Sequence, residues 1–172
     1  MKKTLFFSAA LLIGAIQSSI AQTQNANANA HAKATVVVPI AISNINDLNF
    51  GNIAVSASAG GTVVLDPTNN TRTSSNGVSL PANQGTVQAA MFEVTGAPLF
   101  TYTISVPSQL LVYNGSNNMT VNNFISTPIA GSLDNSGKQT LKIGATLTVN
   151  PNQADGNYQS SGQGFTVTVQ YN

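Results

Sequence analysis

The side chains that could carry out chemistry in this sequence are few and far apart. The sequence has one histidine, His31, and no cysteine, so thiol catalysis and thiolate metal sites are excluded. A serine hydrolase needs a general base beside its nucleophile, and no G-x-S-x-G turn occurs to present such a serine. His31 lies in a run of Asn and Ala residues where no neighbour could complete a catalytic or metal site. We therefore interpret it as a solvated residue.

The five acidic residues could in principle support glycoside hydrolysis, which requires two carboxyl groups facing one sugar. Four of them are aspartates in or next to probable turns, where short polar side chains hydrogen-bond the backbone. Glu93 lies in VQAAMFEV between Phe92 and Val94 and therefore points to the opposite, solvated face of a strand. We predict no enzyme activity, no catalytic residue and no cofactor. The four aspartates are Asp47, Asp66, Asp134 and Asp155.

The remaining polar and aromatic residues bear on two kinds of ligand site, for calcium and for a glycan. Calcium could bind near Asp66 and Asn69, but the acid spacing of known calcium loops is absent, so we predict no metal site. A glycan-binding surface usually presents exposed aromatic rings, and the sequence has no tryptophan. Tyr113 and Tyr158 lie nearest probable loops, whereas the other two tyrosines, Tyr102 and Tyr171, fall on predicted core faces. A secreted monomeric adhesin or glycan-binding module remains an open alternative.

The first residues have the layout of a secretory signal peptide. Lys2 and Lys3 precede an apolar stretch from Leu5 to Ile16, and small residues follow up to Ala21. The stretch is shorter than the roughly 20 residues that a membrane-spanning helix requires. We predict cleavage after Ala21 and no membrane span. The protein would pass through the periplasm and then be located at the cell surface or outside the cell.

Composition limits the partners of the exported chain. Charged residues make up 6% of the sequence, against roughly 25% in an average soluble domain. After removal of residues 1–21, four basic and five acidic side chains remain, which excludes a nucleic-acid or anionic-lipid footprint. Residues 22–33, QTQNANANAHAK, form a low-complexity segment that we predict to be a flexible leader. A surface with so few charges is typical of a protein packed beside other copies of itself.

Alternating apolar residues dominate the chain from residue 34 onward. In ATVVVPIAIS the residues Val36, Val38, Ile40 and Ile42 share one face, which predicts a first strand with its core face there; Pro39 indicates an edge or a bulge. The same period recurs at 61–65, 100–106 and 140–149, with Gly, Asn and Pro turns between the strands. We predict one all-β domain, residues 34–172, with an immunoglobulin-like antiparallel β-sandwich of seven to nine strands.

The last strand of the sequence, FTVTVQYN, has the clearest alternation. Phe165, Val167, Val169 and Tyr171 point to one face, whereas the threonines and Gln170 point to the other. Two interpretations stay open. The strand completes the sheet of its own domain, or it is an edge to which another chain adds a strand.

Several of these segments resemble a known group of proteins. The runs ATVVVPIAIS, DLNFG, MFEVTG and YTISVP, with the closing LTVNPNQADGNY and FTVTVQYN, resemble an uncharacterised family of bacterial secreted β-sandwich proteins. That family is similar to spore coat protein U and to archaic chaperone–usher pilin subunits. The resemblance implies that a periplasmic chaperone grips Phe165, Val167, Val169 and Tyr171, and that a strand of another subunit fills a groove beside them. It implies an exported structural subunit of a surface fibre, pilus or coat that assembles through strand edges with copies of itself or related subunits.

Overall fold

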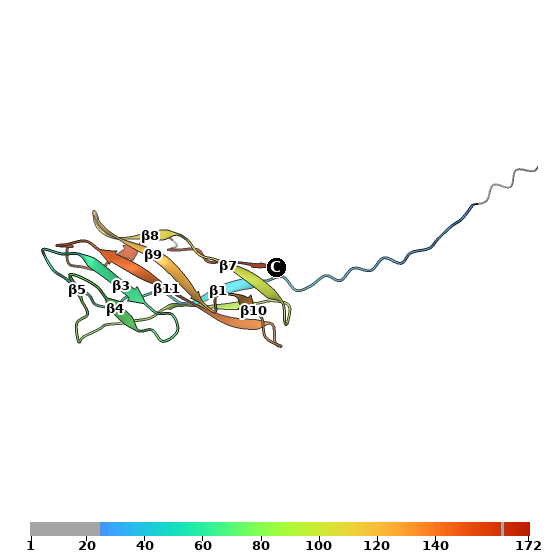
Figure 1. Ribbon diagram of the computed structural model, residues 1–172, viewed down its shortest axis with the longest axis horizontal. Coiled ribbons are helices and arrows are strands. Elements are labelled where there is room, and N and C mark those ends of the chain that lie inside the picture. The colour runs from blue at the N-terminus through green and yellow to red at the C-terminus, as the bar shows by residue number, and fades with distance from the viewer. Residues whose placement is uncertain (1–24, 163) are drawn as a thin grey trace, which may run out of the picture. The chain divides into compact units, whose positions relative to one another are not determined.

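The computed structural model describes residues 25–162 and 164–172 (Figure 1). The predicted signal peptide, residues 1–21, and the start of the predicted leader lie outside the described residues. Residues 25–35, taken by themselves, have no regular secondary structure and are exposed. The remaining unit, Val36–Asn172, is compact.

The compact unit is a β-sandwich, as the sequence predicts, and every strand pair in it is antiparallel. The described residues form thirteen strands, of which the nine with three residues or more match the predicted seven to nine, and the other four have two residues each. In the described part of the chain, no helix is long and apolar enough to span a membrane. The strands are β1 (Ala41–Asn46), β2 (Ala54–Val55), β3 (Gly61–Leu65), β4 (Arg72–Ser74), β5 (Val78–Ser79), β6 (Ala90–Thr95), β7 (Thr101–Ser105), β8 (Gln109–Asn114), β9 (Asn117–Thr127), β10 (Gly131–Ser132), β11 (Lys138–Val149), β12 (Gln159–Ser160) and β13 (Thr168–Tyr171).

The long strand β11 organises the larger sheet. Its first half pairs with β6 and its second half with β3 on the same side, while β9 pairs along its other side. The period-two run TLKIGATLTV explains this role, because its apolar residues are buried while the residues between them face outward. Strands β1, β8, β12 and β4 extend this sheet outward (Figure 1). The buried apolar residues of β11 are Leu141, Ile143, Ala145, Leu147 and Val149.

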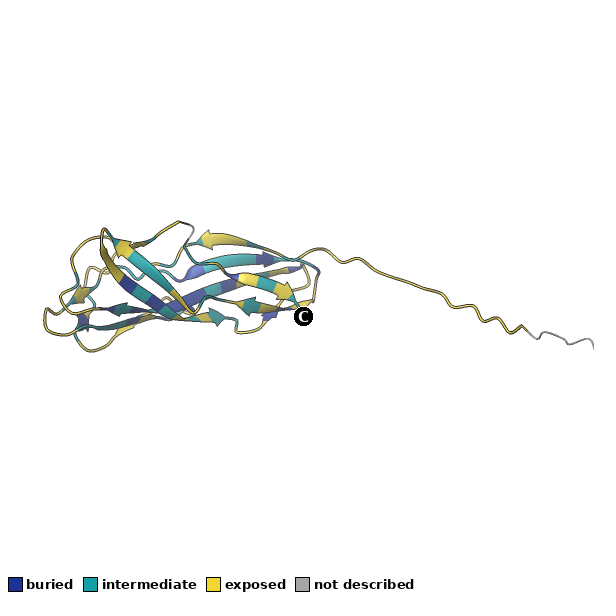
Figure 2. Ribbon diagram, turned by 90° about the horizontal axis from the view of Figure 1, so that it is seen from above, coloured by how far each residue is buried: buried dark blue, intermediate teal, exposed yellow. Residues whose placement is uncertain are grey.

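A second layer covers the larger sheet in two parts. The sheet β10–β7–β13 packs over one half of the core, where Tyr102, Leu133 and Val167 lie against residues of β6 and β11. The short pair β2–β5 and the loop before it cover the other half. Leu48 and Phe124 contact both halves of the core, so the two halves are continuous. Buried residues accordingly line the strands, and exposed residues concentrate in the loops (Figure 2).

The first strand begins later than predicted. Residues 34–40 are not in a strand, and β1 starts at Ala41, which pairs with Thr95 at the end of β6. In this register Pro39 would lie opposite Ala97, which belongs to the turn after β6, and proline has no N–H to donate. The predicted core face is therefore wrong for Val36 and Val38, which are exposed. Ile40 and Ile42 do pack against the core.

The sequence marks the turn of the β8–β9 hairpin at Asn114–Gly115, but the alternation within β9 is interrupted. Met119 and Val121 point into the core, but the next inward residue is Phe124, three positions later rather than two. The register of β9 on β11 shifts there, and Asn123 has a φ of 48°. A bulge of this kind interrupts the alternation, because its extra residue returns the following side chain to the same face. Alternation of apolar residues therefore does not predict the full length of β9.

Tyr102 joins the two sheets at one end of the core. Its ring is buried, and its hydroxyl donates to Oε1 of Gln139 on β11 at 2.6 Å. The same oxygen accepts the backbone N–H of Ser132 at 2.9 Å. Gly131 faces the ring so closely that an added Cβ would lie 2.3 Å from the nearest ring carbon. A glycine is required at 131 for this packing.

We predict that Gly131→Ala destabilises the domain by about 1–3 kcal/mol, because the ring of Tyr102 must move in a close-packed core. Urea unfolding followed by tyrosine fluorescence measures this loss. Gly115→Asn is the matched control, since no atom lies within 4 Å of its added Cβ and asparagine tolerates its φ of 61°. Equal stability of the two variants would contradict the assigned role of Gly131.

Candidate functional site

Several described strands are sheet edges, among them β4, β10 and β12, and two of these edges, β1 and β13, lie at the same half of the core. β13 ends the sheet β10–β7–β13, and β1 ends the path of the larger sheet. Both contribute side chains to the same half of the core, Ile40 and Ile42 from the β1 segment and Val167 and Val169 from the β13 segment. Among the described strands, none pairs with the outer side of either. We refer to these two outer sides together as the β1–β13 edge.

The backbone orientation of β13 follows from its ladder with β7. The N–H of Asn172 donates to the carbonyl of Thr101 at 3.3 Å, so Asn172 belongs to a hydrogen-bonded pair. Residues alternate between bonded and non-bonded pairs along an antiparallel ladder. Tyr171 and Val169 therefore direct their N–H and C=O groups away from β7, toward the open side. These are the groups that an added strand would bind.

The four predicted assembly residues all face inward. Val167 is buried, and Phe165, Val169 and Tyr171 are half-buried against the core shared with β6, β7 and β11. Only Val169 and Tyr171 of these lie within β13, because Phe165 and Val167 precede the strand. The segment thus pairs with β7 as the last strand of its own sheet, and its other side has no strand partner among the described residues.

Tyr171 connects the β13 edge to the residues that precede β1. Its hydroxyl donates to the carbonyl of Val38 at 2.9 Å and accepts the N–H of Ala97 at 2.6 Å. Its ring packs edge-on against Phe100 with a centroid distance of 5.4 Å. Gly96 leaves room for the hydroxyl, since an added Cβ there would lie 2.1 Å from the oxygen. Sequence reasoning placed Tyr171 on a core face but gave no indication of this contact between distant segments.

The segment leading into β1 presents apolar side chains to solvent. Val36 is 98% exposed and Val38 is 60% exposed, and Val37 is also exposed. The segment has no strand assignment in the described chain. Three consecutive exposed valines beside an open strand edge form an uncharged, strand-favouring sequence without a sheet partner.

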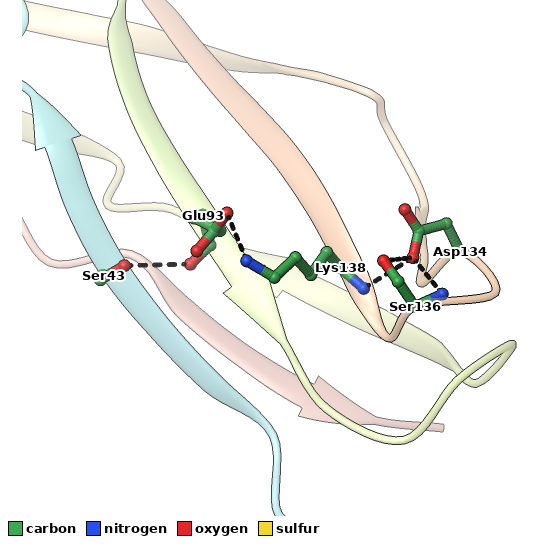
Figure 3. Close-up of polar contacts among 5 residues, drawn as sticks. All are labelled: Ser43, Glu93, Asp134, Ser136 and Lys138. Carbon is green, nitrogen blue, oxygen red and sulfur yellow. Dashed lines mark hydrogen bonds and ion pairs between the residues drawn. The ribbon is translucent and has the colours of Figure 1, made fainter.

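Charges near this region lie on the outer face of the larger sheet (Figure 3). The ammonium of Lys138 on β11 lies 3.3 Å from a carboxylate oxygen of Glu93 on β6, and both side chains are about half exposed. Ser43 on β1 donates weakly to the backbone carbonyl of Glu93 at 3.5 Å. An exposed pair of this kind contributes about 0–1 kcal/mol. The β13 segment has no charged residue at all.

Asp134 organises the turn before β11. Its Oδ1 accepts the hydroxyl of Ser136 at 2.7 Å, and the N–H groups of Lys138 at 2.9 Å and Ser136 at 2.8 Å (Figure 3). The Ser136 hydroxyl and these backbone donors hold the pKa of Asp134 below its ordinary value, and the charge of Lys138 adds to this effect. The turn is stabilised by the charged form of the carboxylate.

The other residues considered for chemistry are not brought together. His31 is exposed in the 25–35 segment. Asp66 accepts the N–H of Thr68 at 2.7 Å and Asn69 that of Thr71 at 3.0 Å, so both side chains shape their own turn. In the described part of the chain, no group of three or more His, Cys, Asp or Glu side chains could hold a metal ion.

Comparison with known families matches residues 40–171 to a family described as a domain of unknown function, DUF4402. The chain belongs to this family. The matched part of this DUF4402 chain includes the whole sandwich from Ile40 through Tyr171 and leaves Val36 and Val38 just outside. No curated protein and no solved structure matches the chain.

We predict that Asp134→Asn lowers stability at neutral pH and that its difference from the parent shrinks under acid. A group with a depressed folded pKa adds stability above its unfolded pKa, near the ordinary 3.8, and this is lost as pH falls through the folded value. Thermal unfolding across this pH range measures the difference. Ser136→Ala should raise the pKa of Asp134 in an NMR titration. A difference independent of pH would contradict the role of the charge.

The two faces of β13 should respond differently to a charge. Val169→Glu places a carboxylate in the half-buried apolar layer and should cost roughly 2–4 kcal/mol. Thr168→Glu places the same group on the exposed face and should leave the monomer within about 0.5 kcal/mol of the parent. Chemical denaturation of both variants makes the comparison. If the two variants lose equal stability, the facing of the strand is wrong.

Proposed function

We propose that this protein is an exported structural subunit of a bacterial surface fibre, pilus or coat that assembles through strand edges. The observation that supports the proposal is the open β1–β13 edge, which lies in the same chain as the exposed, uncharged segment Val36–Val38. The proposed role is structural rather than catalytic.

Monomeric β-proteins usually protect their edge strands with lysine, proline or an inward charge, because free N–H and C=O groups invite further pairing. The β13 sequence, Thr168–Tyr171, has none of these devices. Pro39 and the Glu93–Lys138 pair lie at or near β1 instead. The unprotected edge therefore favours β13 as the strand that receives a partner.

The segment Val36–Val38 of a second copy has the chemistry to add to this edge. A strand added beside β13 would bond the outward backbone groups of Val169 and Tyr171 and place alternate side chains on the core. Fully burying an exposed valine side chain contributes about 1.5–3 kcal/mol. Within its own chain the segment makes a hydrogen bond to Tyr171 but no ladder with β13, so the pairing would be intermolecular.

Two further parts of the proposal concern the route to the surface. The predicted signal peptide would direct the chain to the periplasm, and a periplasmic chaperone would cover the β13 edge until assembly. Premature pairing of an open apolar edge leads to aggregation, which such a partner prevents.

The proposal is tested with Val36→Glu combined with Val38→Glu. We expect a monomer of parental stability that forms no fibres or coat, because both side chains are solvated in the free subunit. Negative-stain microscopy of cell-surface material and size-exclusion chromatography of the purified protein measure assembly.

The matched control is Val64→Glu, which changes another exposed valine, 38% exposed on β3, far in sequence from the β1–β13 edge. This control should assemble like the parent. Assembly of the Val36/Val38 double variant at parental levels, or the absence of any ordered material from the parent at the cell surface, would reject the proposed function.

A further inference from the structure

A polar cleft lies at the other end of the compact unit from the Tyr171–Val38 contact. Strand β11 runs between the two ends, from Lys138 beside the Gly96 turn to Val149, and the loop after it faces the β8–β9 turn (Figure 1). The cleft between this loop and the turn is shallow and open to solvent, with a volume of about 310 Å³. The proposed assembly role does not use this region.

Side-chain amides dominate the lining of the cleft. Asn117 and Asn118 come from the start of β9, and Asn150 and Asn152 come from the loop. In the described structure these four side chains are exposed and form no hydrogen bond with the protein. Each amide offers two N–H donors and a carbonyl acceptor, so they can bind groups that both donate and accept. No acidic or basic side chain lines the cleft.

The loop that carries half of these amides is held in place by hydrogen bonds. Nε2 of Gln153 donates to the carbonyl of Asn118 at 3.2 Å and to the hydroxyl of Tyr158 at 2.8 Å. The Tyr158 hydroxyl donates in turn to the carbonyl of Ala154 at 2.8 Å. The N–H of Asn152 donates to the carbonyl of Ser56 at 3.1 Å. A loop fixed in this way loses little conformational entropy when a ligand binds.

An exposed aromatic ring lies next to one of these amides, outside the residues that line the cleft. Tyr113 on β8 pairs directly with Asn118 on β9, so their side chains share one face of the sheet. The next pair, Val112 and Met119, packs into the core, which places Tyr113 and Asn118 on the outer face. The Tyr113 side chain is 38% exposed. An aromatic ring of this kind can cover the apolar C–H face of a sugar while its hydroxyl stays in water.

We propose that this cleft binds a neutral carbohydrate. Uncharged amides match the vicinal hydroxyl groups of a sugar, each of which donates and accepts, and the Tyr113 ring matches its C–H face. An anionic ligand would lack a cation to pair with, and an apolar ligand would leave the amides without hydrogen-bond partners. The proposal is independent of the assembly function, because different residues at the other end of the compact unit carry it.

The test uses the purified protein without residues 1–21, a glycan array of neutral and sialylated oligosaccharides, and NMR titration with the methyl glycosides of glucose, galactose, mannose and N-acetylglucosamine. We expect saturable binding of at least one neutral sugar, with shifts at Asn118, Asn152 and neighbouring backbone amides. The variants Asn117→Ala with Asn118→Ala, and Tyr113→Leu, should each weaken binding by at least about tenfold, which corresponds to about 1.4 kcal/mol.

Asn135→Ala is the matched control, since it removes an exposed asparagine from the turn before β11 at the other end of the compact unit. Its affinity should equal that of the parent, and circular dichroism should show that all variants keep the parental fold. The proposal is overturned if no neutral sugar binds, if acidic glycans are preferred over their neutral counterparts, or if binding persists in the folded Asn117/Asn118 variant.

Discussion

The apolar face of β11 is the constraint on which the rest of the structure depends. Its five buried apolar side chains contribute to both halves of the core, and the two sides of the strand pair with β6, β3 and β9. The chain has no cysteine and few charges, so neither disulfides nor ion-pair networks can replace this packing. Gly144 within β11 lets the strand approach Leu65 and Pro67, where an added Cβ would lie 2.2 Å from the Leu65 carbonyl oxygen. We therefore expect any side chain at Gly144 to disturb the pairing of β11 with β3.

The second layer, by contrast, leaves part of the sandwich margin open. Because β13 pairs only with β7 among the described strands, the backbone N–H and C=O groups of Val169 and Tyr171 face outward. The Tyr171 hydroxyl joins this margin to Val38 and Ala97, so the last strand and the segment before the first strand meet at one place. An added strand would meet an edge whose side chains are already ordered by their own core, which lowers the entropic cost of pairing.

The two proposals concern opposite ends of the compact unit. The β1–β13 edge offers backbone groups and apolar side chains, whereas the cleft offers side-chain amides, with the Tyr113 ring next to one of them, Asn118. Strand β11 runs between the two regions, and their residues share no contact. Substitutions at one end should therefore have little effect on the stability or binding of the other end. If both proposals hold, the protein would assemble through the β1–β13 edge while the amide cleft at its other end stayed free to bind a sugar.

The sequence by itself determined the all-β class and several strands, because alternation sets which side chains face a core. The run Gly61–Leu65 is a strand with the predicted bounds, and β11 and β7 lie within two residues of theirs. The turns at Asn76–Gly77 and Asp134–Gly137 were also predictable, since positive φ at Asn76 and Gly137 suits these residue types. The inward face of Val167 and Val169 followed from the same alternation.

Only the tertiary structure decided which apolar residues have a partner. Val36 and Val38 continue the alternation of Ile40 and Ile42, yet β6 ends at Thr95 and leaves nothing for them to pair with. The bulge at Asn123 interrupts the alternation of β9, and the cleft depends on two segments more than thirty residues apart, joined by the Gln153–Asn118 bond. Alternation in the sequence predicts to which face of a sheet a side chain points, but it does not predict how long the neighbouring strand is. Strand length and register depend on contacts between residues that are distant in sequence.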